Sequence, residues 1–151
     1  MKRITQTITG RGEDAYAQGL EPGDCMRAAV ASIFELPLHT VPHFVDTGPR
    51  RPGNERLWLY AWHGWALQHG CIIYHLNVFR AEHLSVPGYS LLGGPSPRAT
   101  PGQPLRHVCV GWQGQIVWDP HPSRDGLAAT DECDLLVPIT EYAALLLARE
   151  P

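Results

Sequence analysis

Apolar residues recur at helical spacing in two segments of the chain. The first segment lies between Gly23 and Pro37, and its apolar positions are Met26, Ala29, Val30, Ile33 and Phe34. This spacing is typical of a helix with one buried face, for which Asp24 is a suitable N-cap and Pro37 a suitable end. The second segment predicts a helix from residue 54 to about residue 69, with a stripe of tryptophans expected to enter the core: Trp58, Trp62 and Trp65.

The pattern changes to a period of two after residue 70. Residues 71–78 alternate between two faces, and this alternation predicts a strand with one strongly apolar face, formed by Ile72, Tyr74, Leu76 and Val78. Further strands are predicted over residues 89–92, 106–112, 115–120 and 135–139, with a short terminal helix from residue 141. Residues 93–104 are rich in glycine and proline and predict a loop. Helices followed by a run of strands indicate an α+β fold with an antiparallel sheet.

Two of these strands are expected to form a hairpin around Gln113 and Gly114. A two-residue loop would set the apolar face of one strand against the polar face of the other. A three-residue loop over residues 112–114 instead leaves one face apolar throughout. The apolar pairs that it creates are Val108 with Trp118 and Val110 with Ile116.

The same register has a consequence for the opposite face of the hairpin. His107 would lie directly across from Asp119, with Cβ atoms roughly 5 Å apart. Gly111 follows on that face, and its missing side chain is expected to leave open space. The core requirement therefore predicts a histidine and aspartate pair on neighbouring strands.

Length and charge narrow the possible classes of protein. The chain of 151 residues predicts a single domain over residues 1–151, and its 12 basic and 15 acidic residues form no run of one sign. We therefore expect no nucleic-acid partner and no membrane partner. The N-terminus lacks the apolar stretch of a secretory signal, and no apolar run could cross a bilayer, which predicts a cytoplasmic protein. No cofactor is expected.

The four cysteines, Cys25, Cys71, Cys109 and Cys133, are widely separated and predict free thiols. Cys25 differs from the others because it lies where a turn becomes a helix. A helix N-terminus and a neighbouring imidazolium both favour the thiolate, which is the nucleophilic form of a thiol.

Cys25, His107 and Asp119 together match the logic of a nucleophile, a general base and a group that orients the base. The oxyanion that forms on attack needs hydrogen-bond donors. The backbone N–H of Cys25 is one candidate donor. The side-chain amide of Gln18 is the first choice for the other, and that of Gln6 is the second.

Other interpretations of these residues remain open. Cys25 could be a small core residue, and Cys109 lies on the same face as His107. His107, Asp119 and His121 could form a metal site with two histidines and one carboxylate, although no metal is expected. The loops that contain Arg98 and Arg124 could line a substrate cleft or be ordinary turns, and the substrate-binding residues stay unknown.

Several stretches resemble a known family. These are "GDCMRAAVASIFELPLHTVPHF", "GPSPR" and "RHVCVGWQGQIVWDPHPSRDGL". They are similar to a group of small bacteriophage and prophage proteins whose pattern resembles papain-like cysteine peptidases, and in particular peptidases that remove double-glycine leaders from bacteriocins. The resemblance covers most of residues 18–127. It implies a papain-like fold with Cys25 as nucleophile, His107 as general base and Asp119 as the orienting residue.

We therefore expect a cysteine-dependent amide hydrolase, a peptidase, isopeptidase or amidase, which acts on a protein or peptide through a thioester on Cys25. One alternative is a non-catalytic interaction protein of a phage that keeps the papain-like shell and binds a host factor. Another is acyl transfer of the transglutaminase type, which uses the same triad. The sequence does not predict the substrate or the oligomeric state.

Overall fold

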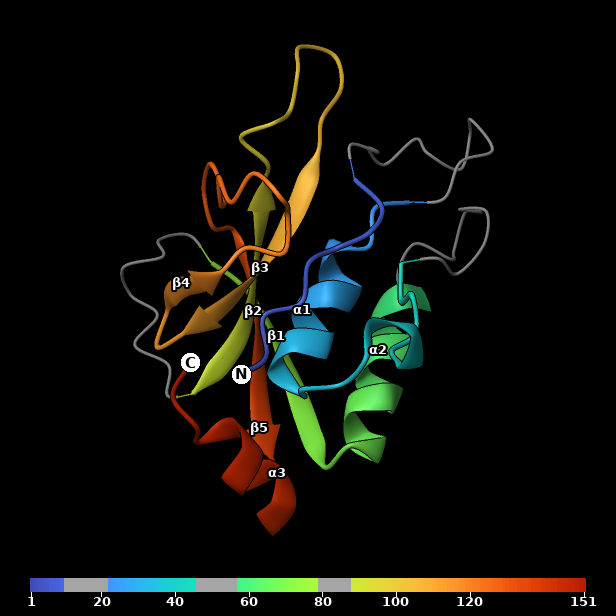
Figure 1. Ribbon diagram of the computed structural model, residues 1–151, viewed down its shortest axis with the longest axis vertical. Coiled ribbons are helices and arrows are strands. Elements are labelled where there is room, and N and C mark those ends of the chain that lie inside the picture. The colour runs from blue at the N-terminus through green and yellow to red at the C-terminus, as the bar shows by residue number, and fades with distance from the viewer. Residues whose placement is uncertain (10–21, 46–56, 79–87) are drawn as a thin grey trace.

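The computed structural model describes residues 1–9, 22–45, 57–78 and 88–151 (Figure 1). The described elements follow one another as α1 (Cys25–Ile33), a 3-10 turn η2 (Leu38–Thr40), α2 (Leu57–Gln68), β1 (Cys71–Asn77), β2 (Tyr89–Pro95), β3 (Arg106–Trp112), β4 (Gln115–Trp118), β5 (Glu132–Pro138) and α3 (Glu141–Leu147). All described strand pairs are antiparallel, and the strand order in the sheet is β1-β5-β2-β3-β4. The predicted α+β class with an antiparallel sheet is confirmed.

The core lies between the sheet and two helices. α1 packs against β3 and β2, and α2 packs against β1, while α3 lies beside β5 at one end of the sheet (Figure 1). The predicted tryptophan stripe enters this core, with Trp62 fully buried, Trp65 nearly so and Trp58 packed partly against it. Within the described residues, no helix combines the length and apolar character needed to cross a bilayer.

α1 begins at Cys25, as predicted, but Asp24 does not cap it with its side chain. The Asp24 carboxylate is fully buried and turns toward the N-terminal segment instead. It accepts hydrogen bonds from the Thr7 N–H, the Thr7 hydroxyl and the Ile8 N–H, at 3.0, 2.7 and 2.8 Å. Asp24 therefore fixes residues 7 and 8 beside the start of the helix.

α1 ends before the predicted end at Pro37. Its C-cap is Phe34, and the next residue, Glu35, takes a left-handed φ of 56°. The N–H of Leu36 then reaches back to the carbonyl of Ala31, at 3.0 Å. This closure satisfies a carbonyl of the last turn without any contribution from the proline.

The strongly apolar face predicted for β1 is the exposed one. Ile72, Tyr74 and Leu76 are 42%, 55% and 37% exposed, whereas Cys71 and Ile73 are buried. α2 packs on the face of β1 that carries Cys71 and Ile73, and its tryptophans fill the core there.

β2 extends through residues that the sequence predicts to be a loop. Gly93, Gly94 and Pro95 all pair with β3. A Cβ atom on Gly94 would lie 1.9 Å from the carbonyl oxygen of Ala129, so only glycine lets the strand continue beneath that chain segment. The glycine here marks a close approach of backbone rather than a turn.

The predicted register of the β3–β4 hairpin is wrong. Trp112 pairs with Gln115, so the loop has two residues, and both have positive φ: 51° at Gln113 and 77° at Gly114. This is the geometry of a type I′ turn. The expected conflict of faces does not arise because a bulge follows. Gly111 pairs with Ile116, but Val110 pairs with Trp118.

Candidate active site

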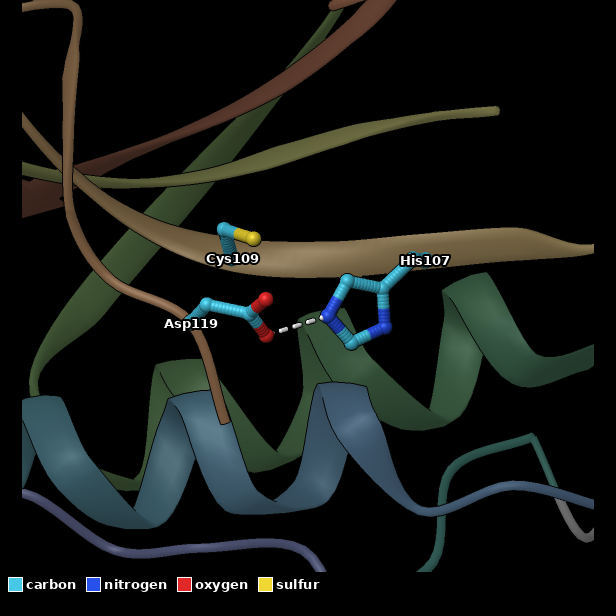
Figure 2. A group of neighbouring side chains, drawn as sticks. All are labelled: His107, Cys109 and Asp119. Carbon is cyan, nitrogen blue, oxygen red and sulfur yellow. Dashed lines mark hydrogen bonds and ion pairs between the residues drawn. The ribbon is translucent and has the colours of Figure 1, made fainter. Parts of the chain in front are cut away.

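His107 and Asp119 are in contact in the buried part of the site. His107 Nε2 and Asp119 Oδ1 are 2.6 Å apart, and the two side chains are only 4% and 3% exposed (Figure 2). The predicted contact is confirmed, although not through the predicted register. One step along the ladder from the Val110–Trp118 pair, Asp119 lies opposite Cys109, so it reaches His107 diagonally.

The Asp119 carboxylate is held by backbone donors as well as by the imidazole. Its Oδ1 accepts from the N–H of His121 at 2.7 Å, and its Oδ2 accepts from the N–H of Gly126 at 2.8 Å. Burial alone would raise the pKa of Asp119. The hydrogen bonds from His107, His121 and Gly126 outweigh it and hold this pKa below the usual range. Asp119 is therefore ionised at neutral pH.

The environment of His107 favours the imidazolium form. Burial would lower the pKa of His107, but hydrogen bonds to Asp119, Cys109 and Cys25 raise it above the ordinary value. The electrostatic interaction with Cys25 acts in the same direction. A charged imidazole between a carboxylate and a thiol stabilises the thiolate in turn.

Cys25 approaches His107 from the helix. It is the first residue of α1 and is partly exposed, whereas the other three cysteines are buried. Figure 2 shows His107 with Nε2 toward Asp119 and the second ring nitrogen on the far side of the ring, above the helices. Burial raises the pKa of Cys71 and of Cys133 to about 11. Cys25 is thus the accessible thiol of the four.

Cys109 is a third group beside the imidazole. The ligand atoms of His107, Cys109 and Asp119 lie within 4.8 Å of one another, and burial raises the pKa of the Cys109 thiol. His121, the third ligand of the metal site considered above, is not in this group. Its Nδ1 contacts the Ser123 hydroxyl at 2.8 Å. The short contact between His107 Nε2 and Asp119 Oδ1 already gives each of these two atoms a hydrogen-bond partner.

His121 borders the pair without joining it. Its ring meets that of His107 edge to face, with centroids 6.1 Å apart. Burial lowers the pKa of His121, and the positive charges of Arg98 and His107 lower it further. His121 is therefore neutral at neutral pH and covers one edge of the imidazole.

The N-terminal segment connects the two halves of the site. The N–H of Gln6 donates to the carbonyl of Pro120 at 3.0 Å, and the N–H of Asp24 donates to the carbonyl of Ile8 at 3.3 Å. The segment therefore lies between the residue after Asp119 and the residue before Cys25. No period or motif in the sequence indicates this placement.

Of the two predicted oxyanion donors, Gln6 is the one that the structure describes. Its side chain is buried, its Nε2 donates one hydrogen to the carbonyl of Ile8 at 2.7 Å, and its Oε1 has no hydrogen-bond partner. The second hydrogen of an amide nitrogen is then available to another acceptor. Gln18, the first choice, lies outside the described residues.

Gly111 does not leave open space beside the site, contrary to expectation. A Cβ atom there would lie 2.5 Å from Ser90 Oγ and 2.8 Å from a carbon of Leu92. The glycine instead makes room for the Ser90 and Leu92 side chains of the neighbouring strand β2.

Sequence reasoning did not identify how the loop after β4 encloses Asp119. Arg124 donates to the carbonyls of Asp119 and His121, and its guanidinium lies 3.8 Å from the centroid of the Trp118 ring. Arg98 reaches the other side of Asp119 from the turn after β2. The only indication of these contacts in the sequence is that the two loops containing Arg98 and Arg124 lie close along the chain to the strands predicted for His107 and Asp119.

Comparison of the chain with protein-family models, with curated proteins and with solved structures found no significant match.

Proposed function

We propose that the protein is a papain-like, cysteine-dependent amide hydrolase with Cys25 as nucleophile, His107 as general acid and base, and Asp119 as the residue that orients His107. The observation that carries the proposal is the position of the imidazole. It contacts the buried Asp119 carboxylate at 2.6 Å and interacts electrostatically with Cys25, the first residue of α1. This arrangement serves nucleophilic catalysis through a thiolate.

In the first step of the proposed reaction, the Cys25 thiolate attacks the carbonyl carbon of an amide. The new S–C bond pushes an electron pair onto the carbonyl oxygen, and the helix N-terminus together with Gln6 donates hydrogen bonds to that oxygen. When the C–N bond breaks, the proton on His107 moves to the leaving nitrogen. The product that remains is a thioester on Cys25.

In the second step, water attacks the thioester and neutral His107 takes a proton from the water. The S–C bond breaks, and Cys25 leaves as the thiolate beside the re-formed imidazolium. Asp119 keeps the ring in one orientation in both steps, because its carboxylate is itself held by two backbone N–H groups. The proposed substrate is a protein or peptide, and the unpaired state of all four cysteines fits a reducing, cytoplasmic location.

The first experiment measures alkylation of Cys25 by iodoacetamide from pH 4 to pH 9, with the modified residue assigned by peptide mapping. The pKa of a free thiol is about 8.5, so at pH 6 a stabilised thiolate should react up to about 100-fold faster than a free thiol. Because the raised pKa of His107 keeps the imidazolium charged above pH 6.5, the advantage should extend through neutral pH. His107→Ala should remove it.

A second histidine and aspartate pair offers the matched control. His75 Nδ1 contacts Asp134 Oδ1 at 2.6 Å, on β1 and β5. His75→Ala removes a similar contact elsewhere in the sheet and should leave the reactivity of Cys25 unchanged. If Cys25 reacts only near pH 8.5, or equally in wild type and His107→Ala, the catalytic proposal is wrong and a search for a binding partner follows.

Gln6→Ala should lower turnover by about 10²-fold to 10³-fold, the usual effect of losing one oxyanion donor. Hydrolysis of p-nitrophenyl acetate measures turnover without knowledge of the natural substrate. The rate of Cys25 alkylation should stay near that of wild type, because alkylation forms no oxyanion. Equal losses in both assays would instead indicate that Gln6 supports the fold of the N-terminal segment.

A further inference from the structure

Arg98 stands beside Asp119 at the oxygen that His107 does not use. It lies in the turn after β2, and its Nη1 is 3.6 Å from Asp119 Oδ2. The same nitrogen is 3.6 Å from Asp125 Oδ2 and donates to the Ser123 hydroxyl at 3.1 Å. The two oxygens of Asp119 therefore face two different cations, the imidazolium at Oδ1 and the guanidinium near Oδ2.

The guanidinium of Arg98 has two acidic neighbours that differ in their exposure to water. Its Nε and Nη2 are buried and have no hydrogen-bond partner among the described residues, and its side chain is only 17% exposed. Of its two acidic neighbours, Asp125 is 52% exposed and Asp119 is 3% exposed. Water screens the first interaction much more than the second, so the attraction to Asp119 is the stronger of the two.

The charged and titratable groups around the His107–Asp119 contact come from several elements. They are Cys25 on α1, Cys109 on β3, and His121, Arg124 and Asp125 in the loop after β4. Of the two arginines, Arg124 is directed at main-chain carbonyls and at the Thr5 hydroxyl. Arg98 is therefore the arginine that faces the Asp119 carboxylate.

A permanent charge matters here because the charge of His107 is temporary. When the imidazolium gives its proton to the leaving nitrogen, Asp119 would remain as a buried carboxylate without a cation beside it. Such a group is strongly disfavoured. A guanidinium keeps its charge at every relevant pH, so it compensates Asp119 in both protonation states of His107.

We propose that Arg98 is a positioning residue that keeps Asp119 ionised and thereby sets the acid limit of the pH range in which Cys25 and His107 are active. The inference rests on the proposed function of these three residues and adds a fourth residue to their charge balance.

The test is the acid limb of the Cys25 alkylation profile in Arg98→Gln. Loss of the cation should move this limb upward by about one pH unit, which lowers the rate at pH 4.5 by about tenfold. The rate near pH 7 should change less than twofold, because the thiolate is already formed there. A variant that had lost its fold would instead lose the rate at both pH values.

Three further variants distinguish charge from shape. Arg98→Lys keeps the cation and should restore most of the acid limb. Asp125→Asn removes a competing anion and should move the limb slightly downward. Arg106→Gln removes an exposed arginine, paired with Asp131 and Glu132, and should leave the profile unchanged.

Two results would overturn the inference about Arg98: an acid limb in Arg98→Gln that coincides with wild type, or equal shifts in Arg98→Gln and Arg98→Lys. Failure of the proposed function gives a different result, because Cys25 would then lack His107-dependent reactivity in the wild-type protein, before any change at Arg98. That result would also remove the basis for the inference.

Discussion

Asp119→Ala should lower the turnover of p-nitrophenyl acetate by about 10³-fold to 10⁴-fold, the range seen when the orienting acid of a triad is lost. Without the carboxylate, His107 has no acceptor at Nε2 and loses the buried anion that compensates its charge on that side. The N–H groups of His121 and Gly126 lose their acceptor as well. The thiolate then loses the imidazolium that stabilises it, so alkylation of Cys25 at pH 6 should fall too.

Asp119→Asn should lie between wild type and Asp119→Ala. An asparagine can accept from His107 with its one oxygen, but its NH₂ group must then face the N–H of Gly126 and the guanidinium of Arg98. Donors would meet donors, so the site favours a carboxylate over an amide. Asp131→Ala, which removes a half-exposed carboxylate paired with Arg106, is the control. A loss below tenfold in Asp119→Ala would exclude an orienting role for this residue.

Asp24→Ala should lower the free energy of unfolding by about 3–5 kcal/mol, which is large for a single substitution. Asp24 is fully buried. Its carboxylate accepts hydrogen bonds from the backbone N–H groups of Thr7 and Ile8 and from the Thr7 hydroxyl. Alanine leaves these donors without their acceptor beside a fully buried position. Urea unfolding at pH 7 measures the difference.

The comparison variant for Asp24 is again Asp131→Ala. Its ion pair with Arg106 is half-exposed, so its loss should cost about 0–1 kcal/mol. Asp24→Asn keeps one acceptor oxygen and should fall between the two. A cost below about 1 kcal/mol for Asp24→Ala would show that the N-terminal segment does not depend on this carboxylate. A large cost together with reduced ester turnover would link the segment to the placement of Gln6.

Periodicity predicted the elements of the fold well where one helix or strand packs on one neighbour. The start of α1 at Cys25 and the start of α3 at Glu141 follow from local signals, and Thr140 caps α3 through its side chain as such signals require. The extension of β2 through Gly93 and Gly94 does not follow from local signals. Glycine is common in loops, and only the approach of Ala129 shows why it belongs to a strand here.

The hairpin shows how a correct contact can follow from a wrong register. The alternation of residues sets His107 and Asp119 on one face in the predicted and in the observed register, because Trp118 pairs with Val108 in the first and with Val110 in the second. The two-residue turn conflicts with the apolar pattern only if β3 and β4 pair residue by residue without a bulge. The bulge at Val110 and Gly111 removes that conflict, because the extra residue in β4 restores the match of apolar faces.

The sequence by itself determined the α+β class, a thiol at the start of a helix, and the pairing of His107 with Asp119, because each depends on residues near one another along the chain or on strand alternation. Only the tertiary structure decided that Asp24 anchors the N-terminal segment, that Gln6 lies between the two halves of the site, and that Arg98 faces Asp119. These contacts join segments far apart in sequence. Burial and charge in the folded protein determine these contacts, and no local sequence pattern predicts them.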